Sequence, residues 1–435
     1  MSLVNILKSK CVSVWGVGYL GYTTMLRFQN AGFKIIAYDP NIEQLQQFKT
    51  GHYPNRDRLI SWSKVGFVPK LNFDNVHVAS NPRELFLNSS LHMICLPDKR
   101  YMLEVVKFFR GNIKKAAVRP MVVFESSFVP GHVENDFINK LASYGKISGR
   151  DYMVACLFRT DWKVESFFMQ KDKMPIAGCC KKSLEIMREL TRYLGIETIE
   201  FDSIKEAELY NNSLNAFQSV ANDFVRQLAF GYPGVNFKKL AQLLFENFSF
   251  EECNLNIGTG GMRMTFALDY LIEGSDNPDK LTLLKESQNV SISSVLSYAE
   301  YLIRKEYKNV AILGITYSGN QKDLVLSPSI TLADYLIKNG VNVYMHDPLC
   351  SGSEIKRLVK GVKILPHFSD KPLSVGAIIL ASDHSLYKYL KPSSVQLLCK
   401  KARLIIDNHG IWSRIMFSTK ARYHQVGDGS LFLSK

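Results

Sequence analysis

Short apolar runs and longer segments of helical spacing alternate through the first part of the chain. Residues 12–39, VSVWGVGYLGYTTMLRFQNAGFKIIAYD, predict a strand, a glycine turn, a helix and a second strand in one continuous βαβ unit. Apolar runs at 77–80, 91–97 and 121–126 predict further strands, each ending in polar or turn residues. Strands this apolar are typical of a parallel sheet that is covered on both faces.

A second pattern of the same kind occupies the end of the chain. Residues 203–230 have apolar positions at helical spacing and no proline, and they predict a long amphipathic helix. From residue 308 onward the strand-like runs KNVAILG, VNVYMHD, AIILASD and RLIIDN follow, with a helix between the first two. We therefore predict an α/β protein with two Rossmann-like α/β domains joined by a central helical region that contains the long helix. The predicted domains are 1–200, 201–300 and 301–435.

The turn after the first strand has the features of a dinucleotide site. Its residues are Gly16, Val17, Gly18, Tyr19, Leu20 and Gly21. The first glycine suits a tight turn, the second lets backbone N–H groups approach a pyrophosphate, and the third lets the helix pack close to the sheet. The ligand then meets a helix N-terminus. Asp39 ends the second strand, where a carboxylate can accept both ribose hydroxyls and would repel a 2′-phosphate. This pattern predicts NAD in preference to NADP.

Residues at the ends of later strands extend this predicted site. In an open α/β sheet the ligand lies beyond the carboxyl ends of the strands. This rule places Pro97 and the consecutive residues Glu125, Ser126 and Ser127 beside the cofactor.

Composition limits the classes of function. The 435 residues are 46% hydrophobic and 22% charged, which is typical of a globular protein with more than one domain. The formal net charge of +14 suits an anionic small molecule, but the basic residues are spread along the chain, so no nucleic acid is expected. We expect a cytoplasmic protein with no membrane contact, because no apolar run is long enough to span a bilayer and no signal-peptide core precedes the first strand. The 8 cysteines form no CxxC pair and predict no metal site.

Taken together, the motifs resemble those of one family, the NAD-dependent UDP-glucose/GDP-mannose dehydrogenases, nearly from end to end. The matching segments are the turn at 16–21, ESSFVPG at 125–131, residues 207–217 against AExxKxxxN, GTGG at 258–261, residues 314–328 against GxxYKxxxxDxRxSP, and YMHDP at 344–348. They occur in the family's order.

The resemblance implies a reaction, a cofactor and an assembly. The family oxidises the C6 hydroxyl of a nucleotide sugar to a carboxylate for polysaccharide biosynthesis and passes two hydrides to two NAD molecules. A cysteine thiolate forms the thioester intermediate, a lysine and an asparagine stabilise oxyanions, and acidic groups move protons. The three predicted domains would then bind NAD, form a homodimer through the long helix, and bind the nucleotide sugar. Gly258, Gly260 and Gly261 would contact the substrate.

This chain departs from the family at the residues that perform the chemistry. Arg263 stands at the position of the family's cysteine, and Asn211 at that of its lysine, whereas Asn215 matches its asparagine. The family's aspartate falls on Ala267. An ungapped match of LFRTDWK at 157–163 puts Trp162 at the family's glutamate, and a shift of one residue brings Asp161 there instead.

Further positions leave alternatives open. Ser318 and Val325 replace a lysine and an arginine that bind the substrate in the family. Cys253 and the pair Cys179 and Cys180 are the alternatives for a compensating thiol, and each also suits a packed core position. Two function classes therefore remain: an NAD-dependent oxidoreductase with a changed active site that does not carry out the four-electron oxidation, and an inactive NAD-binding relative that acts in binding, scaffolding or regulation.

Overall fold

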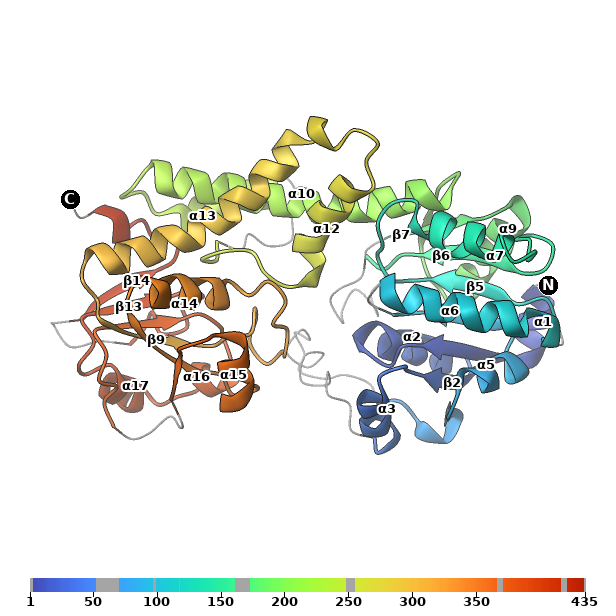
Figure 1. The fold of residues 1–435 in the computed structure, drawn as a ribbon, viewed down its shortest axis with the longest axis horizontal. Coiled ribbons are helices and arrows are strands. Elements are labelled where there is room, and N and C mark those ends of the chain that lie inside the picture. The colour runs from blue at the N-terminus through green and yellow to red at the C-terminus, as the bar shows by residue number, and fades with distance from the viewer. Residues whose placement is uncertain are drawn as a thin grey trace. The chain divides into compact units, whose positions relative to one another are not determined.

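The chain folds into two compact units (Figure 1). The structure, a computed structural model, describes residues 3–51, 70–96, 99–116, 118–160, 173–247, 255–365, 371–415 and 421–433. Unit 1 comprises residues 1–214 and 273–276, and unit 2 comprises residues 215–272 and 277–435.

Unit 1 is built on a sheet whose described strands have the order β3-β2-β1-β4-β5-β6-β7-β8. The strands are β1 (Cys11–Trp15), β2 (Lys34–Tyr38), β3 (Val76–Val78), β4 (Leu91–Ile94), β5 (Met121–Phe124), β6 (Met153–Leu157), β7 (Met174–Gly178) and β8 (Thr198–Glu200). Neighbouring strands are parallel except β6 and β7, which are antiparallel. The strand order reverses between β1 and β4, and this is the point where α/β sheets bind ligands.

Helices cover both faces of this sheet. They are α1 (Leu3–Ser9), α2 (Tyr19–Asn30), α3 (Ile42–Lys49), α5 (Pro82–Asn88), α6 (Lys99–Asn112), α7 (Lys140–Ala142) and α9 (Lys181–Tyr193), with 3-10 turns at Phe73–Asn75 and Ile113–Lys115 and a π-helix at Val133–Asn139. Val12 and Val14 of β1 lie in one core together with residues of α2 and α9. Trp15 lies in a second core with residues of α5 and α6. The apolar runs in the sequence therefore reflect strands that are buried on both sides.

Unit 2 contains a second, wholly parallel sheet with the described order β11-β10-β9-β12-β13-β14. Its strands are β9 (Asn309–Leu313), β10 (Asn342–His346), β11 (Lys363–Ile364), β12 (Ala377–Leu380), β13 (Leu404–Asp407) and β14 (Arg422–Gln425). Its helices are α11 (Phe237–Asn247), α12 (Met262–Glu273), α13 (Thr282–Arg304), α14 (Pro328–Lys338), α15 (Gly352–Leu358), α16 (Ser385–Lys388) and α17 (Pro392–Leu398), with turns at Pro278–Lys280 and Leu431–Leu433. Helix α10 (Ile204–Gly231) begins in unit 1 and ends in unit 2.

The predicted fold class is confirmed: the protein has two Rossmann-like α/β sheets and a long helix between them in the sequence. Gly32 and Gly340 follow corresponding helices with φ values of 80° and 79°, which side chains with a Cβ rarely adopt. The division at residues 200 and 300 stays a prediction. None of the helices in the described ranges is both long enough and apolar enough to cross a membrane.

Candidate functional site

The glycine turn of unit 1 has the geometry that its sequence predicts. Gly16 has a φ of 102°, and a Cβ there would lie 2.7 Å from the carbonyl oxygen of Cys95. A Cβ at Gly21 would collide with the carbonyl oxygen of Gly16. These two glycines are therefore needed for the turn and for the close approach of α2 to β1.

Gly18 differs from the other two glycines because neither its backbone conformation nor its packing requires a glycine. Its φ is −69°, and a Cβ there would have only the Nε2 atom of Gln44 within 4 Å, at 3.5 Å. Gly18 is the N-cap of α2, and no side chain in the described part of the chain accepts a hydrogen bond at this cap. The first amides of a helix have no partner within the helix. A pyrophosphate fits this helix end.

Asp39 closes the turn from the end of β2. Its Oδ2 accepts the amide of Val17 at 2.8 Å, and its Oδ1 accepts the amide of Asn41 at 2.8 Å. Burial raises the pKa of Asp39, and the two amides oppose that effect. Each carboxylate oxygen has a second lone pair, so Asp39 can also accept ribose hydroxyls.

Glu125 lies behind the turn in a buried polar network. It is 2% exposed, and its Oε2 accepts a hydrogen bond from Thr24 and lies 3.3 Å from Cys95 Sγ and 3.8 Å from Arg159 Nη1. Arg159 also donates to Thr24 at 3.1 Å. Burial raises the pKa of Glu125, and the Arg159 guanidinium opposes that rise. Glu125 therefore links α2 to the ends of β4, β5 and β6.

The two serines after Glu125 have different environments. Ser126 is 6% exposed, and its hydroxyl has no hydrogen-bond partner among the described residues. A buried hydroxyl without a partner at the carboxyl end of a strand fits a bound ligand. Ser127 accepts a hydrogen bond of 2.6 Å from Asn211 Nδ2. Asn211, which the motif comparison predicts to occupy the family's lysine position, is thus in contact with the predicted cofactor loop.

Helix α10 anchors the rest of this loop. Glu208 is 1% exposed and accepts the amides of Gly131 at 2.6 Å and Val133 at 3.1 Å. Asn212 donates to the carbonyl oxygen of Phe128 at 2.7 Å. Burial raises the pKa of Glu208 to about 7, although the two amides favour the charged form. Sequence reasoning matched Glu208 to the family's AE pair but gave it no role.

Replacing Glu208 by Gln is expected to remove a pH dependence of stability. The folded-state pKa of about 7 lies above the ordinary 4.5, so the folded protein holds this proton more tightly in that range. The free energy of unfolding should therefore fall as the pH rises from about 4.5 to 7, by up to about 3 kcal/mol. Denaturant unfolding at pH 5 and 8 measures this slope. Glu206→Gln is the matched control, because Glu206 lies two residues earlier on the same helix and its side chain is exposed. An unchanged slope in Glu208→Gln would contradict the assignment.

In unit 2 the predicted substrate glycines pack against another motif segment. A Cβ at Gly260 would lie 2.7 Å from Tyr317 Cδ2 and 2.8 Å from Pro328 Cδ. Gly261 has a φ of 79°, and its amide donates to the carbonyl oxygen of Val325 at 2.9 Å. A Cβ at Gly258 would lie 2.6 Å from Val295 Cγ2. The structure thus brings the loop at 258–261 and the segment at 314–328 together.

A buried ion pair holds this loop. Arg226 of α10 pairs with Asp223, donates to Thr259 Oγ1 at 2.8 Å and donates to the carbonyl oxygen of Asn256 at 3.1 Å. Ser287 of α13 donates to Asp223. Arg226 and Asp223 are both buried, and their partners come from distant parts of the chain. A paired, buried charge of this kind fixes the position of a loop.

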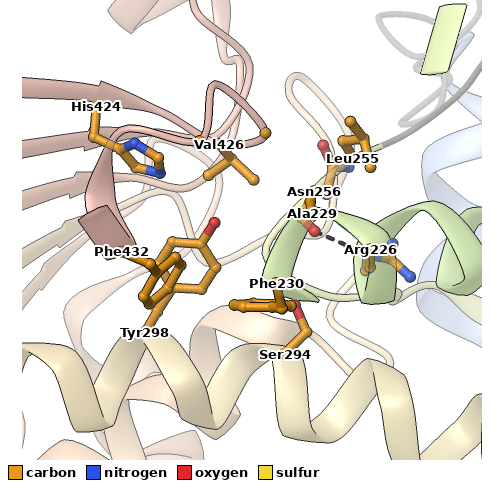
Figure 2. Close-up of a pocket in the computed structure, with 12 residues that line it drawn as sticks. Arg226, Ala229, Phe230, Leu255, Asn256, Ser294, Tyr298, His424, Val426 and Phe432 are labelled. Atoms are coloured by element: carbon orange, nitrogen blue, oxygen red, sulfur yellow. Dashed lines mark hydrogen bonds between the residues drawn. The ribbon is translucent and has the colours of Figure 1, made fainter. Parts of the chain in front are cut away.

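Two small cavities adjoin the loop within unit 2. One is lined by Arg226, Ala229, Phe230, Leu255, Asn256, Ser294, Tyr298, His424, Val426, Gly427, Gly429 and Phe432 (Figure 2). It is walled by aromatic rings and contains no residue of the predicted site. The other is lined by Asn256, Ile257, Gly258, Thr316, Tyr317, Pro328, Ser329, Leu332, Ala381 and Asn408, and it combines residues of both motif segments.

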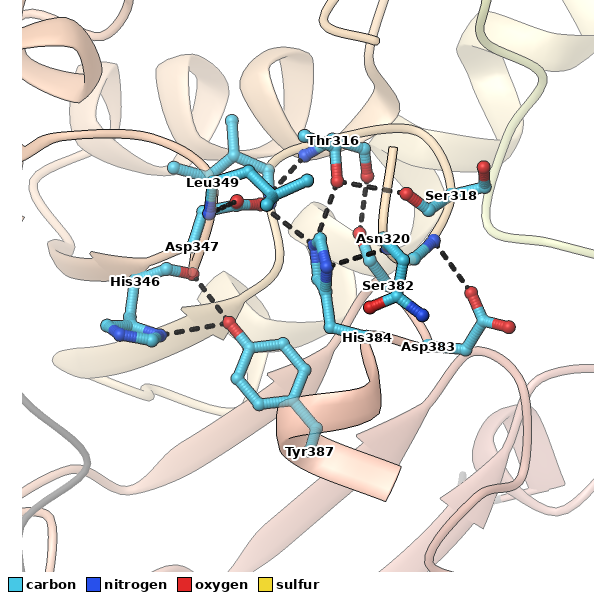
Figure 3. Close-up of polar contacts among 12 residues, drawn as sticks. Thr316, Ser318, Asn320, His346, Asp347, Leu349, Ser382, Asp383, His384 and Tyr387 are labelled. Atoms are coloured by element: carbon cyan, nitrogen blue, oxygen red, sulfur yellow. Dashed lines mark hydrogen bonds and ion pairs between the residues drawn. The ribbon is translucent and has the colours of Figure 1, made fainter. Parts of the chain in front are cut away.

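A second turn in unit 2 repeats the design of the first (Figure 3). Asp347, after β10, accepts the amides of Ile315 at 2.7 Å and Thr316 at 3.1 Å, as Asp39 accepts that of Val17. His384 lies beside it: its Nδ1 is 2.9 Å from the donating amide of Asn320, and its Nε2 is 3.2 Å from Asp347 Oδ2. Because Nδ1 accepts a hydrogen bond, the ring carries a proton on Nε2. Burial raises the pKa of Asp347, but His384 and the amides outweigh it and hold this pKa at about 2.

The remaining residues that the sequence predicted for the site lie either outside the described ranges or in α10 and α12. Pro97, Asp161, Trp162 and Cys253 lie outside the described residues. Arg263 is placed in α12, but its side chain is outside the described set. Asn215 is half-buried in α10, four residues after Asn211. Ala267 is 1% exposed. No cluster of three or more His, Cys, Asp or Glu side chains suited to a metal occurs in the described ranges.

Comparison with known proteins supports the family resemblance that the motifs indicate. A family model described as "UDP-glucose/GDP-mannose dehydrogenase family, UDP binding domain" matches residues 311–414, which include the network of Figure 3. UDP-N-acetyl-D-mannosamine dehydrogenase from Methanocaldococcus jannaschii is 22% identical over 97% of this chain and 97% of its own. The resemblance to the UDP-glucose/GDP-mannose dehydrogenase family is confirmed. UDP-glucose 6-dehydrogenase from Rickettsia prowazekii is 24% identical over 94% of this chain and 95% of its own.

Solved structures of such dehydrogenases share the fold. A UDP-glucose dehydrogenase from Pyrobaculum islandicum has a TM-score of 0.77 with 17% identity, covering 96% of this chain and 97% of its own. A UDP-D-ManNAc dehydrogenase from Pyrococcus horikoshii has a TM-score of 0.72 with 22% identity, covering 96% and 99%. The two-sheet architecture is therefore that of nucleotide-sugar dehydrogenases.

Proposed function

We propose that this chain is an NAD-dependent oxidoreductase that acts on a CH–OH group of a UDP-sugar and stops after one hydride transfer. Such an oxidation would remove a hydride and a proton from the carbinol and leave a carbonyl, with NAD, when bound, as the hydride acceptor. The named relatives support a UDP-sugar as the substrate. A role in polysaccharide biosynthesis in the cytoplasm fits such a substrate.

The residues of unit 1 suit NAD. Gly18 and the N-terminus of α2 would receive the pyrophosphate, and Asp39 the adenosine ribose. The hydroxyl of Ser126, buried and without a partner in the described part of the chain, would face the ligand.

The observation that carries the proposal of a changed active site is the hydrogen bond of 2.6 Å from Asn211 Nδ2 to Ser127 Oγ. A lysine at this position would supply a positive charge to a developing oxyanion, as the resemblance implies. Asn211 supplies a neutral amide that is already bonded to the cofactor loop, while Asn215 remains as a second amide. Arg263 has no thiol, so it cannot form a thioester.

The substrate would bind in unit 2 near the second cavity. The loop with Gly258, Gly260 and Gly261 packs against Tyr317 and Pro328. Because glycine has no side chain, the backbone of this loop would be able to approach a ligand in the second cavity. The Ser318 hydroxyl donates to Gln321 at 2.7 Å, where a lysine would point a charge at a phosphate. With Val325 also uncharged, we expect weaker UDP-sugar binding than a complete family site would give.

A homodimer through α10 is part of the proposal. Phe217 is 64% exposed and Phe224 is 56% exposed, and their spacing of seven residues places them on one face of the helix. Large exposed apolar side chains on one face favour burial against a partner.

The second candidate is a catalytically inactive, NAD-binding regulatory or scaffold protein. Burial of Ala267 in an apolar cluster with Ala216 and Leu268 favours it, because the position of the family's aspartate holds no proton-transfer group.

Incubation of the purified protein with NAD and a panel of UDP- and GDP-sugars tests the proposal. We expect one NADH per sugar, a carbonyl product that hydroxylamine traps, and no sugar acid. Two NADH per sugar with a uronate product would refute it. NAD binding without any NADH would establish the second candidate instead.

A further inference from the structure

Cys179 and Cys180 join β7 to α9. They lie at the opposite end of the sheet strands from the glycine turn of unit 1. Strand β7 is antiparallel to β6: its last residue, Gly178, pairs with Ala155 in the middle of β6, and the amide of Cys179 donates to the carbonyl oxygen of Val154 at 2.9 Å. The carboxyl end of β7 therefore lies at the amino ends of the parallel strands. Chemistry at this cysteine pair is consequently separate from a dinucleotide bound at the turn.

Both sulfur atoms share one buried hydroxyl. Ser183 is fully buried, and its Oγ lies 3.5 Å from Cys179 Sγ and 3.5 Å from Cys180 Sγ. The Ser183 hydroxyl donates its hydrogen to the carbonyl oxygen of Cys180 at 2.8 Å and accepts the amide of Cys180 at 3.1 Å. One lone pair on the hydroxyl is left, so only one of the two thiols can donate to it.

The two sulfurs differ in their surroundings. Cys180 is the N-cap of α9, where its sulfur accepts the amide of Ser183, and the helix continues with Lys181 and Lys182. A helix N-terminus and nearby cations favour a thiolate. Burial alone would raise the pKa of Cys180, but the Ser183 hydroxyl and amide, Cys179 and the Lys182 amide outweigh it, so this pKa is lowered.

Every other cysteine in the described ranges has the opposite shift. Burial raises the pKa of Cys11, Cys95, Cys156, Cys179, Cys350 and Cys399. Cys179 and Cys180 are thus an adjacent pair of one protonated thiol and one thiolate-prone sulfur.

We propose that Cys179 and Cys180 form a redox-sensitive modification site, with Cys180 as the attacking thiol and Cys179 as the resolving thiol. The Cys180 thiolate attacks hydrogen peroxide, the O–O bond breaks, an S–O bond forms, and hydroxide leaves and takes a proton. The sulfur is oxidised to sulfenic acid and the peroxide is reduced. Cys179 then attacks that sulfur, the S–S bond forms, the S–O bond breaks, and water leaves.

Oxidation has a structural consequence at the start of α9. A sulfur bound in a disulfide is a poorer acceptor than a thiolate, so the amide of Ser183 loses its cap. The expected effect is fraying of the first turn of α9, next to β7.

Peptide mass spectrometry of the full-length protein after limited peroxide treatment tests this site. Residues 174–181 form one tryptic peptide with both cysteines, and it should lose two hydrogens on oxidation. In Cys179→Ala a sulfenic acid should persist on Cys180 and be trapped by dimedone, whereas Cys180→Ala should yield neither product. Cys11 is the internal control, because among the described cysteines it is half-buried like Cys179 and Cys180.

The rate at which iodoacetamide alkylates each cysteine of the wild-type protein tests the site without any variant. At pH 7 the wild-type protein should be alkylated by iodoacetamide at Cys180 at least about tenfold faster than at Cys11. Equal rates at the two cysteines, or no dimedone adduct in a folded Cys179→Ala protein, would overturn the proposal. Circular dichroism checks that each variant is folded.

Discussion

Gly18→Asp is expected to abolish NAD binding while leaving unit 1 as stable as before or slightly more stable. The backbone of Gly18 is compatible with any residue, and a new Cβ would meet only Gln44 Nε2 at 3.5 Å. An aspartate at the N-cap of α2 would accept the first helix amides and add a few tenths of a kcal/mol to stability relative to glycine. The same carboxylate would occupy and repel the pyrophosphate position, so NAD affinity should fall at least about hundredfold.

Titration calorimetry and thermal unfolding of the two proteins measure these opposite effects. Gly18→Asn is the matched control, because asparagine caps a helix equally well and carries no charge. It should bind NAD more weakly than wild type and more strongly than the aspartate variant. NAD affinity that stays at the wild-type level in a folded Gly18→Asp protein would mean that the dinucleotide does not bind at this turn.

The second large effect is a gain of reaction. Replacing Arg263 by Cys and Asn211 by Lys together is expected to produce sugar acid from a UDP-sugar, which the wild-type protein should not form. As the resemblance to the family implies, the thiol would provide the nucleophile for a thioester, and the ammonium would stabilise the developing oxyanion. Each group supplies several kcal/mol in a working site, so we expect uronate to rise at least about a hundredfold above the wild-type background.

Uronate is measured by mass spectrometry, and NADH per sugar by absorbance. The variant with Arg263→Ser and Asn211→Lys is the matched control, since a serine hydroxyl is a poorer nucleophile and cannot form the thioester. It should form no uronate. A double variant that binds NAD and a UDP-sugar, yet forms no more acid than this control, would show that other residues also block the reaction.

The sequence predicted the parts of the structure that local rules govern. The glycine turn, the strands β1 to β5, β9, β10, β12 and β13, and α10 each follow from residues that are near one another in the chain, and the turn at Gly16 follows from steric limits on φ. The strands β6, β8, β11 and β14 were not predicted. Asp39 was expected because it ends the strand that must return beside the turn.

The networks that hold the site could not be predicted in this way. Glu125 contacts Thr24 and Arg159, which lie 101 residues before it and 34 residues after it in the sequence. Asp347 and His384 likewise lie after different strands, β10 and β12. Such contacts depend on the order in which the strands pack. The sequence alone does not show whether an arginine such as Arg159 is buried or exposed. The hydrogen bond from Asn211 to Ser127 also needed the placement of α10 beside the loop.

The packing around Ala267 restricts which side chains this position can hold. Ala267 is 1% exposed and lies in an apolar cluster with Ala216 and Leu268, with Val220, Leu271 and Leu284 against it. A carboxylate placed there by Ala267→Asp would be buried without a partner in the cluster, at a cost of several kcal/mol. An acidic group at this position would therefore need a polar partner introduced into the cluster at the same time.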